Sequence, residues 1–487
     1  MPEDKPNVIL ITADQMRGDC LSADGHPVVD TPHLDHLASN GTRFRCAYTA
    51  VPSCIPARAT LMTGLSQWHT GVLGMGRGQG GFPNDFPHTL AGDLADSGYQ
   101  THLVGKGHFN PQRASMGFQS RELDESGRLR QNGQRDEYRQ WFDREKKRDI
   151  SPDDHGVDWN SWIGRPWHTE EHLHPTAWTM TRSLHFLANR DFTRPFFLNI
   201  SFARPHSPYV PPRSFFEMYD RQKTPKPYVG DWAHMHDRPN EAANINAWRG
   251  KQSAFRIRRA RAGYYGEISF IDSQIGRLRN WLSRHQPETA RNVWILFTSD
   301  HGDMVGDHHL WRKTYAYEGS ARVPMIVSPP PRLRRCLPVS DKPVELRDIM
   351  PTILDAAGVE PPSYLDGRSL LPLMRGEQID WRPYIHGEHS ACYSREQEMH
   401  YVTDGKRKYI WLPLIDTEQF FDLEEDPGEL NDLSDQPERA GEFNLWRGRL
   451  IQELEARECG WTKDGDLHSP EDGQPLVSPW RNVRYTG

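Results

Sequence analysis

Four short runs rich in apolar and β-forming residues alternate with segments in which apolar residues recur at helical spacing. A short apolar run suits a strand buried on both faces, and helical spacing suits an amphipathic helix. The runs cover residues 7–11, 99–104, 195–202 and 292–298. The helical segments cover residues 32–40, 88–95, 176–189, 262–285 and 344–357. This alternation predicts an α/β fold with a large, mostly parallel sheet flanked by helices.

The pattern changes after about residue 372. Asp404-Gly405 lies between β-forming residues, and this dipeptide is typical of a tight β-hairpin. Further strands are expected at 409–412 and 419–423, and a helix at 439–454 is expected to pack on them. We therefore predict two domains, a large α/β domain over residues 1–372 and a small antiparallel α+β domain over residues 373–487.

Two long polar stretches interrupt the alternation, near residues 111–166 and 211–252. Both show little periodicity, and long irregular stretches within a domain are usually functional or disordered. The first one follows directly after the loop around Lys106, at the carboxyl end of a predicted strand. We expect it to act as a lid on the substrate side.

Composition and charge narrow the class of protein. The chain has 487 residues and a net charge of −7 without a basic run, which argues against a nucleic acid partner. No apolar run approaches a membrane span, and the run at 8–11 is too short for the core of a signal peptide. The six cysteines include no close pair, which indicates a reduced compartment. We therefore expect a cytoplasmic protein that does not bind membranes.

The most distinctive stretch is Cys54-x-Pro56-x-Arg58, followed by Thr63-Gly64. Pro56 has no N–H and a fixed φ, so it fits the first turn of a helix that Gly64 can end. Cys54 then lies at a helix N-terminus, where unpaired N–H groups and the helix dipole favour an anion. Arg58 follows one turn later and can stabilise whatever Cys54 becomes. The alternative is a buried structural cysteine, since free cysteine is among the most buried residue types.

Polar side chains follow the first and last strands of the predicted sheet, at the ends where functional groups gather in such folds. Asp14 and Gln15 end the first strand, and Asp300 and His301 follow the last. Two carboxylates with an amide or imidazole suit a divalent cation such as Ca²⁺ or Mg²⁺. Taken alone, an aspartate after a strand is more often a helix cap or a turn residue.

Lys106 and His108 could act on an anionic substrate, and two more basic side chains, His206 and Lys313, follow later strands. Lys106 and His108 follow the second strand, where they would place a positive charge and a proton carrier over the substrate. His206 lies between prolines after the third strand. Each also has an ordinary interpretation, as part of a polar loop, as a turn histidine or as a solvated lysine.

Taken together, these features resemble the type I sulfatases of the alkaline phosphatase-like superfamily. The stretch from Cys54 to Gly64 is similar to the family signature, Cys-x-Pro-Ser/Ala-Arg followed by Thr-Gly. The other matching parts are the Asp14 strand, Lys106-x-His108, Pro205-His206, Ser299-Asp300-His301-Gly302, Lys313 and the run 420–431. The resemblance covers most of the chain, and the two polar stretches match loosely. It implies the alkaline phosphatase-like fold, with catalysis in residues 1–372.

The resemblance also implies what the residues around the cysteine do. A maturation enzyme would oxidise Cys54 to formylglycine, and Arg58 would stabilise it. A divalent metal, with Ca²⁺ favoured over Mg²⁺ or Mn²⁺, would be held by Asp14, Gln15, Asp300 and His301. Gln15 and His301 stand where many members have Asp and Asn. Both departures lower the negative charge of the site and leave the choice of metal open.

The remaining roles concern the sulfate ester itself. Lys106 and Lys313 would bind the sulfate oxygens, and His206 would contact the sulfate or the leaving group. One hydroxyl of the hydrated aldehyde would attack sulfur and form a covalent sulfate. The second hydroxyl, deprotonated by a base such as His108, would expel sulfate and restore the aldehyde. The metal and the lysines would neutralise charge that develops on the sulfate oxygens.

A carbohydrate sulfate is the expected substrate, because the two polar stretches are rich in Arg, His and Trp, which could bind a charged sugar. His386, in His386-Gly387-Glu388-His389, is expected to reach the rim of the site. An aryl or alkyl sulfate is the open alternative. So are two other functions, a phosphonate monoester or phosphodiester hydrolase of the same superfamily and a non-catalytic anion-binding protein with unmodified Cys54. The pair of Lys106 and His108 favours a sulfatase, because it is the sulfatase form of that loop.

Overall fold

The computed structural model describes residues 5–75, 79, 86–125, 135–333, 336–469 and 473–482. Its main sheet has eight strands. They are β1 (Asn7–Asp14), β2 (Thr42–Phe44), β4 (Gln100–Gly105), β5 (Ser120–Leu123), β6 (Phe196–Pro205), β7 (Val293–Ser299), β8 (Met325–Ser328) and β9 (Val339–Ser340). The strand order is β5-β4-β6-β1-β7-β8-β2-β9. Only β8 runs antiparallel to its neighbours, so the predicted, mostly parallel α/β sheet is confirmed.

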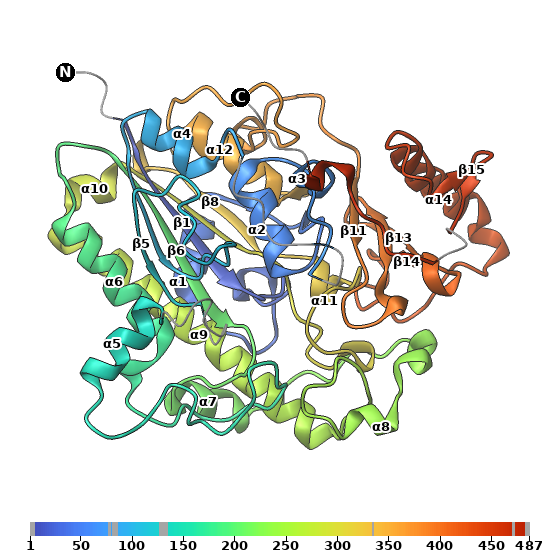
Figure 1. Ribbon diagram of the computed structural model, residues 1–487, viewed down its shortest axis with the longest axis horizontal. Coiled ribbons are helices and arrows are strands. Elements are labelled where there is room, and N and C mark those ends of the chain that lie inside the picture. The colour runs from blue at the N-terminus through green and yellow to red at the C-terminus, as the bar shows by residue number, and fades with distance from the viewer. Residues whose placement is uncertain are drawn as a thin grey trace.

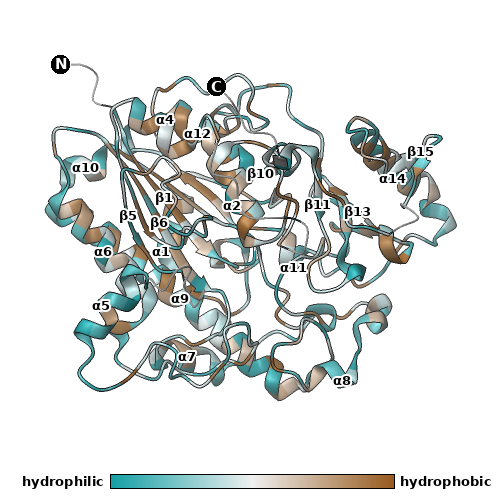
Figure 2. Ribbon diagram, viewed as in Figure 1, coloured by the Kyte–Doolittle hydropathy of each residue, from teal (hydrophilic) through white to brown (hydrophobic). Residues whose placement is uncertain are grey.

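Helices cover both faces of this sheet (Figure 1). One layer contains α1 (Pro32–Ser39), α6 (Pro175–Asn189) and α9 (Ala254–His285), and the other contains α2 (Cys54–Thr63), α4 (Leu90–Asp96) and α12 (Ile349–Ala356). Successive side chains of a strand point to opposite faces. In β1, Ile9 and Ile11 pack with the first layer, whereas Val8 and Leu10 pack with the second. This double burial explains why the strand is apolar without interruption (Figure 2).

The two polar stretches contain more regular structure than the sequence pattern indicates. β5 and α5 (Glu137–Glu145) lie in the first, and α7 (Arg213–Asp220) and α8 (Pro239–Ala242) lie in the second. β5 pairs with β4 and forms the edge of the main sheet. An edge strand has fewer buried positions, so its apolar pattern is weak. The lid function of the first stretch stays a prediction, and residues 126–134 within it lie outside the described residues.

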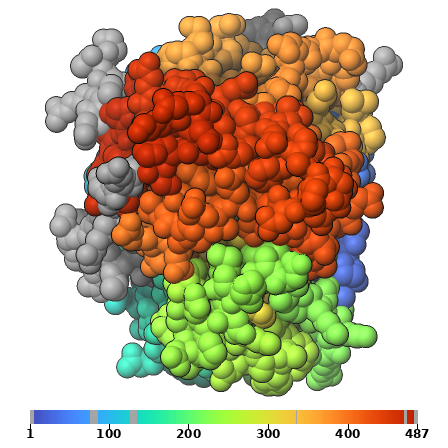
Figure 3. All heavy atoms as spheres, turned by 90° about the vertical axis from the view of Figure 1, so that its right-hand side faces the viewer, coloured from blue at the N-terminus to red at the C-terminus, as the bar shows by residue number. Residues whose placement is uncertain are grey.

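The C-terminal part forms a four-stranded antiparallel sheet in the order β11-β12-β13-β14. These strands are β11 (Ile385–His389), β12 (Met399–Thr403), β13 (Arg407–Leu412) and β14 (Thr417–Asp422), and α14 (Ala440–Glu455) packs on them. The predicted hairpin joins β12 to β13, and Gly405 adopts φ +88° there. The small antiparallel α+β unit is therefore confirmed, whereas its boundary at residue 372 stays a prediction. Figure 3 shows this unit in contact with the second polar stretch along one face.

Smaller elements complete the described chain. The short strands are β3 (Ala47–Tyr48), β10 (Val344–Glu345), β15 (Thr462–Lys463) and β16 (Asp466–Leu467). The short helices are α3 (Gln67–Thr70), α10 (Pro287–Arg291), α11 (Glu318–Ala321) and α13 (Leu371–Met374). Among the described residues, no helix combines the length and apolar character that crossing a membrane requires.

Candidate active site

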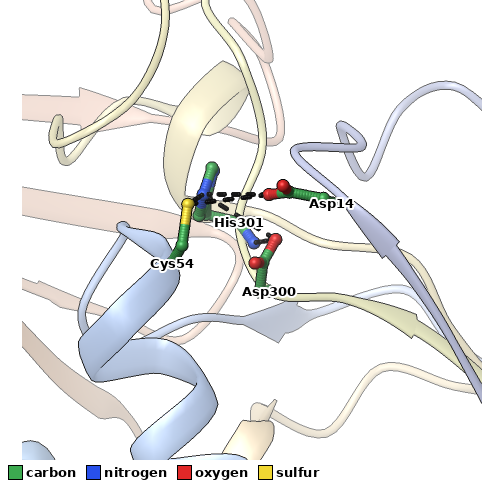
Figure 4. Close-up of side chains that lie close together, drawn as sticks. All are labelled: Asp14, Cys54, Asp300 and His301. Atoms are coloured by element: carbon green, nitrogen blue, oxygen red, sulfur yellow. Dashed lines mark hydrogen bonds and ion pairs between the residues drawn. The ribbon is translucent and has the colours of Figure 1, made fainter. Parts of the chain in front are cut away.

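The carboxyl ends of β1 and β7 meet the N-terminus of α2 in one buried cluster (Figure 4). β1 and β7 are adjacent and parallel, with Ala13 opposite Ser299, so the residues that follow each strand become neighbours. Side-chain ligand atoms of Asp14, Cys54, Asp300 and His301 lie within 4.8 Å of one another. All four side chains are almost fully buried. The structure thus brings together the cysteine and three of the four residues predicted to bind metal.

Cys54 is the first residue of α2, as predicted from Pro56. Its Sγ lies 3.0 Å from Lys313 Nζ and 3.1 Å from His301 Nε2. Lys106 Nζ is 3.7 Å away. Burial and the Asp14 carboxylate raise the pKa of this thiol, but Lys106, Lys313 and His301 outweigh them and lower it to about 7. Position 54 therefore favours a negatively charged group, although it is buried.

Arg58 lies one turn further along α2 and connects three strands of the main sheet. Its Nε donates to Asp300 Oδ2 at 2.9 Å, and its Nη1 donates to Lys106 O at 2.7 Å and Ser201 Oγ at 2.9 Å. Within the part of the chain that the structure describes, Nη2 is buried and has no hydrogen-bond partner. Arg58 thus fixes the positions of β4, β6 and β7 around Cys54, and its Nη2 stays available as a donor to a further oxygen.

The two lysines predicted to bind sulfate reach the cluster from two segments that are far apart in the sequence. Lys106 follows β4, and its Nζ forms an ion pair with Asp14 Oδ2. Lys313 lies in the loop after β7, and its Nζ donates to Gln15 Oε1 at 3.1 Å. Both lysines are at least 97% buried. With Arg58, three cations face the two carboxylates of Asp14 and Asp300. This concentration of positive charge around Cys54 suits an anionic substrate.

The predicted metal ligands have the lone pairs that a divalent cation needs. His301 donates Nδ1–H to Gly302 O at 2.8 Å, so its Nε2 faces the cluster. Burial lowers the pKa of His301, but Asp300 and Cys54 outweigh it and raise this pKa, so Nε2 must lose a proton before it can bind a metal. The Gln15 side chain donates through Nε2 to Asp303, so its Oε1 is turned toward Lys313. Carboxylate and amide oxygens together with one imidazole nitrogen form a donor set that fits a hard divalent ion. The residues present therefore fit the expected metal.

Asp303 is a site residue that the sequence pattern did not single out. Besides the Gln15 amide it accepts hydrogen bonds from Tyr209 Oη at 2.6 Å and from the backbone N of Val305 and Arg312, both at 2.9 Å. It therefore determines which way the Gln15 amide points. Its position three residues after Asp300 was the available signal, but an acidic residue in a loop is too common to be selected.

The two predicted catalytic histidines lie in the loops after β4 and β6. His206 is buried, and its Nδ1 donates to Ser207 O at 2.7 Å. Burial and the nearby Lys313 hold its pKa well below the usual range, so the ring is neutral with Nε2 as an acceptor. Trp159, from the first polar stretch, stacks on the ring at 4.9 Å. His108 adopts φ +59°, and its backbone N–H donates to Glu125 Oε1 at 2.9 Å.

His386 is not part of this cluster, contrary to the expectation that it reaches the rim. Its ring is buried between His400 at 3.3 Å and Arg457 at 3.1 Å within the C-terminal unit. Because Arg457 donates to Nδ1, the ring proton lies on Nε2 and faces His400. The residue that meets the site from this strand is His389, whose Nε2 accepts from Ser53 Oγ at 2.8 Å. Ser53 directly precedes Cys54, so β11 holds the start of α2.

Two family models and several known proteins are similar to this chain. The family model described as Sulfatase matches residues 6–359, and the model described as N-sulphoglucosamine sulphohydrolase, C-terminal, matches residues 306–455. The chain is 43% identical to the Arylsulfatase of Clostridium perfringens, over 99% of this chain and 100% of that relative. It is 30% identical to the Choline-sulfatase of Rhizobium meliloti, over 90% and 84% of the two chains.

Two solved structures share the fold of this chain. The phosphonate monoester hydrolase of Agrobacterium radiobacter superposes with a TM-score of 0.76 at 25% identity, covering 97% of this chain and 99% of that one. A structure in complex with its substrate D-glucosamine-2-N,6-O-disulfate superposes with a TM-score of 0.72 at 21% identity, covering 93% and 98%. At 21% identity, this second superposition is evidence only for the shared alkaline phosphatase-like fold.

Proposed function

Because the chain belongs to the sulfatase family and is a sulfuric ester hydrolase, we propose that its nucleophile is a formylglycine made from Cys54. The observation that carries this proposal is the position of Cys54, buried at the N-terminus of α2 with Lys313 Nζ at 3.0 Å and Lys106 Nζ at 3.7 Å. A structural cysteine needs no such cations. A maturation enzyme of the host is the partner that this proposal requires.

Each neighbouring side chain has a task in the proposed hydrolysis. Formylglycine supplies a hydrated aldehyde, with one hydroxyl to attack sulfur and a second to expel sulfate. Lys106 and Lys313 bind the sulfate oxygens, since their ammonium groups already surround position 54. Arg58 offers its buried Nη2 to an oxygen of the nucleophile. Neutral His206 accepts a hydrogen bond from a hydroxyl of the substrate, and His108 serves as the base that the resemblance implies.

Direct detection of the modified residue is the decisive experiment. Mass spectrometry of the tryptic peptide 46–58 from natively produced protein should find a lighter form at Cys54 that reacts with aldehyde reagents. The other five cysteines serve as internal controls, since they should stay unmodified. A free thiol at position 54, from a host with a competent maturation system, would remove the proposed nucleophile.

We further propose that Asp14, Gln15, Asp300 and His301 hold a divalent metal, with Ca²⁺ favoured because most donors are oxygens. When bound, such an ion would polarise the sulfate ester as a Lewis acid. Treatment with EDTA should therefore lower kcat/KM by about 100-fold or more. Adding back Ca²⁺, Mg²⁺ and Mn²⁺ separately, with elemental analysis, should identify the ion. Full activity of a protein shown to contain no metal would contradict the proposal.

Lys313 should contribute mainly to catalysis rather than to substrate binding. Its Nζ contacts both position 54 and Gln15 Oε1, so it faces the atoms on which charge develops. Removing one preorganised donor of this kind typically costs about 10²- to 10³-fold in kcat. We expect Lys313→Met to show this loss in steady-state rates, and Lys313→Arg to restore part of it. A rise in KM with unchanged kcat would instead assign Lys313 to ground-state binding.

The proposed substrate is a carbohydrate sulfate. Relatives support this choice only as a class, because they include an N-acetylglucosamine-6-O-sulfatase of Bacteroides thetaiotaomicron at 26% identity as well as aryl and choline sulfatases. Trp159, stacked on His206, supplies an aromatic face of the kind that packs on sugar rings. Initial rates on matched aryl, choline and amino sugar sulfates would decide among these substrates.

A phosphonate monoester hydrolase is the second candidate. It is favoured by the superposition on the Agrobacterium radiobacter enzyme and by Gln15 and His301, which would serve that reaction as well. Lys106 and His108 argue for the sulfatase. Initial rates on an aryl sulfate and the matched aryl phosphonate would separate the two candidates, and faster turnover of the phosphonate would reverse our choice.

A further inference from the structure

Arg312 is a buried cation without an ion-pair partner among the described residues, and it precedes the sulfate-binding Lys313. Its exposed fraction is 6%. Among the residues that the structure describes, its Nε and Nη2 have no hydrogen-bond partner, and its guanidinium makes no ion pair. A buried, unpaired charge is strongly unfavourable. Such a side chain therefore indicates an anion that comes from outside the chain.

The backbone holds Arg312 in a fixed relation to the catalytic cluster. Its φ is +69°, a conformation that is rare for a non-glycine residue and concentrated at functional sites. Its N–H donates to Asp303 Oδ1 at 2.9 Å, and its carbonyl accepts from Met304 N at 2.8 Å. Asp303 also holds the Gln15 amide. Arg312 and Gln15 are thus positioned by the same carboxylate.

One aromatic ring lies over the guanidinium, and a second ring packs on the first. Its Cζ lies 5.3 Å from the ring centre of Tyr393, which follows β11, and Tyr393 stacks on Trp248 of the second polar stretch at 6.5 Å. Both rings are only half-buried, so this aromatic pair is partly open to solvent and ligands. Figure 3 shows that these two segments meet on one face of the molecule.

Hydrogen bonds tie the loop that carries Tyr393 to the loop that carries Lys313. Gln397 accepts from Tyr393 N at 2.7 Å through Oε1 and donates to Thr314 Oγ1 at 2.9 Å through Nε2. Burial raises the pKa of the neighbouring Cys392 to about 11, while both Lys313 and Arg312 oppose the shift. The loop therefore lies close to both cations. A substrate with its sulfate at Lys313 would extend past this loop toward Arg312.

We propose that Arg312 is a specificity residue that binds a second anionic group, a carboxylate or a second sulfate, on the leaving group of the sulfate ester. The inference rests on the proposed sulfatase reaction and names its substrate class. The planar guanidinium offers a fork of donors that matches either oxyanion. Tyr393 and Trp248 supply apolar faces for the ring that carries this group.

Matched aryl sulfates test this inference. The substrates are 4-sulfooxybenzoate with a carboxylate, benzene-1,4-diyl bis(sulfate) with a second sulfate, and methyl 4-sulfooxybenzoate without a second charge. We expect Arg312→Gln to lower the ratio of kcat/KM for each anionic substrate to that for the methyl ester by about 10- to 100-fold, mainly through KM. Arg312→Lys should recover part of the ratio. Arg213→Gln, on the exposed face of α7, should leave the ratio unchanged.

Three outcomes separate the inference from the proposed function. Turnover of the methyl ester by the wild type supports the sulfatase reaction whatever Arg312 does. If Arg312→Gln lowers kcat/KM equally on all three substrates, or on none of them, the proposed role of Arg312 is overturned while the sulfatase reaction stands. If no substrate turns over, calorimetry with 4-hydroxybenzoate and its methyl ester decides. Tighter binding of the carboxylate by the wild type, lost in Arg312→Gln and partly kept in Arg312→Lys, supports the inference, and equal binding overturns it.

Discussion

Replacing Cys54 with serine is expected to lower kcat for sulfate ester hydrolysis by at least about 10⁴-fold, the scale of losing a catalytic nucleophile. Serine has one hydroxyl where the hydrated aldehyde has two. The serine oxygen can still take the sulfuryl group from the ester and release the alcohol, but nothing then expels the sulfate. The expected time course of alcohol release is a burst of at most one equivalent per active site, after which turnover stops. Mass spectrometry should find the added sulfuryl group on peptide 46–58.

Two companion variants make this result specific. Cys54→Ala removes the oxygen as well and should show neither burst nor adduct. Cys336→Ser changes a partly buried cysteine that packs on the sheet core and should leave turnover close to that of the wild type. Steady turnover by Cys54→Ser at a rate near that of the wild type would show that one hydroxyl suffices, and it would contradict the formylglycine proposal.

Much of the fold and of the cluster around Cys54 could be predicted, because short stretches of the sequence indicate the elements involved. The strand that ends at Asp14 and the strand before Asp300 are both apolar without interruption, which indicates central strands in a parallel sheet. Parallel strands bring their carboxyl ends to one edge, so the two carboxylates were expected to meet, and the pairing of β1 with β7 places them together. Pro56 likewise indicated the start of α2.

The remaining site features depend on packing that local patterns do not carry. In a strand, residues 386 and 389 point to opposite faces, but only the docking of the small sheet decides which face meets α2. The orientation of the Gln15 amide depends on Asp303 and Tyr209, which are far apart in the sequence. A buried, unpaired arginine such as Arg312 has the same sequence signal as a solvated one. β5 was missed because its residues are mostly polar.

The second large effect is expected from Arg58→Met, which should lower the free energy of unfolding by about 3–5 kcal/mol. Arg58 is 5% exposed and Asp300 is 1% exposed, so the variant leaves a buried carboxylate without its counter-charge. Lys106 O and Ser201 Oγ lose their donor at the same time. Urea unfolding in the presence of EDTA measures the effect without a contribution from bound metal.

The surface pair of Arg45 and Asp341 provides the matched control. Arg45 Nε lies 2.6 Å from Asp341 Oδ1, about as close as the buried pair, but both side chains are about half exposed. Arg45→Met should therefore cost at most about 1 kcal/mol. Adding Asp300→Asn to Arg58→Met should recover part of the loss, because no unpaired charge then stays buried. If Arg58→Met were no more destabilising than Arg45→Met, the charges around Cys54 would be balanced by groups other than Arg58.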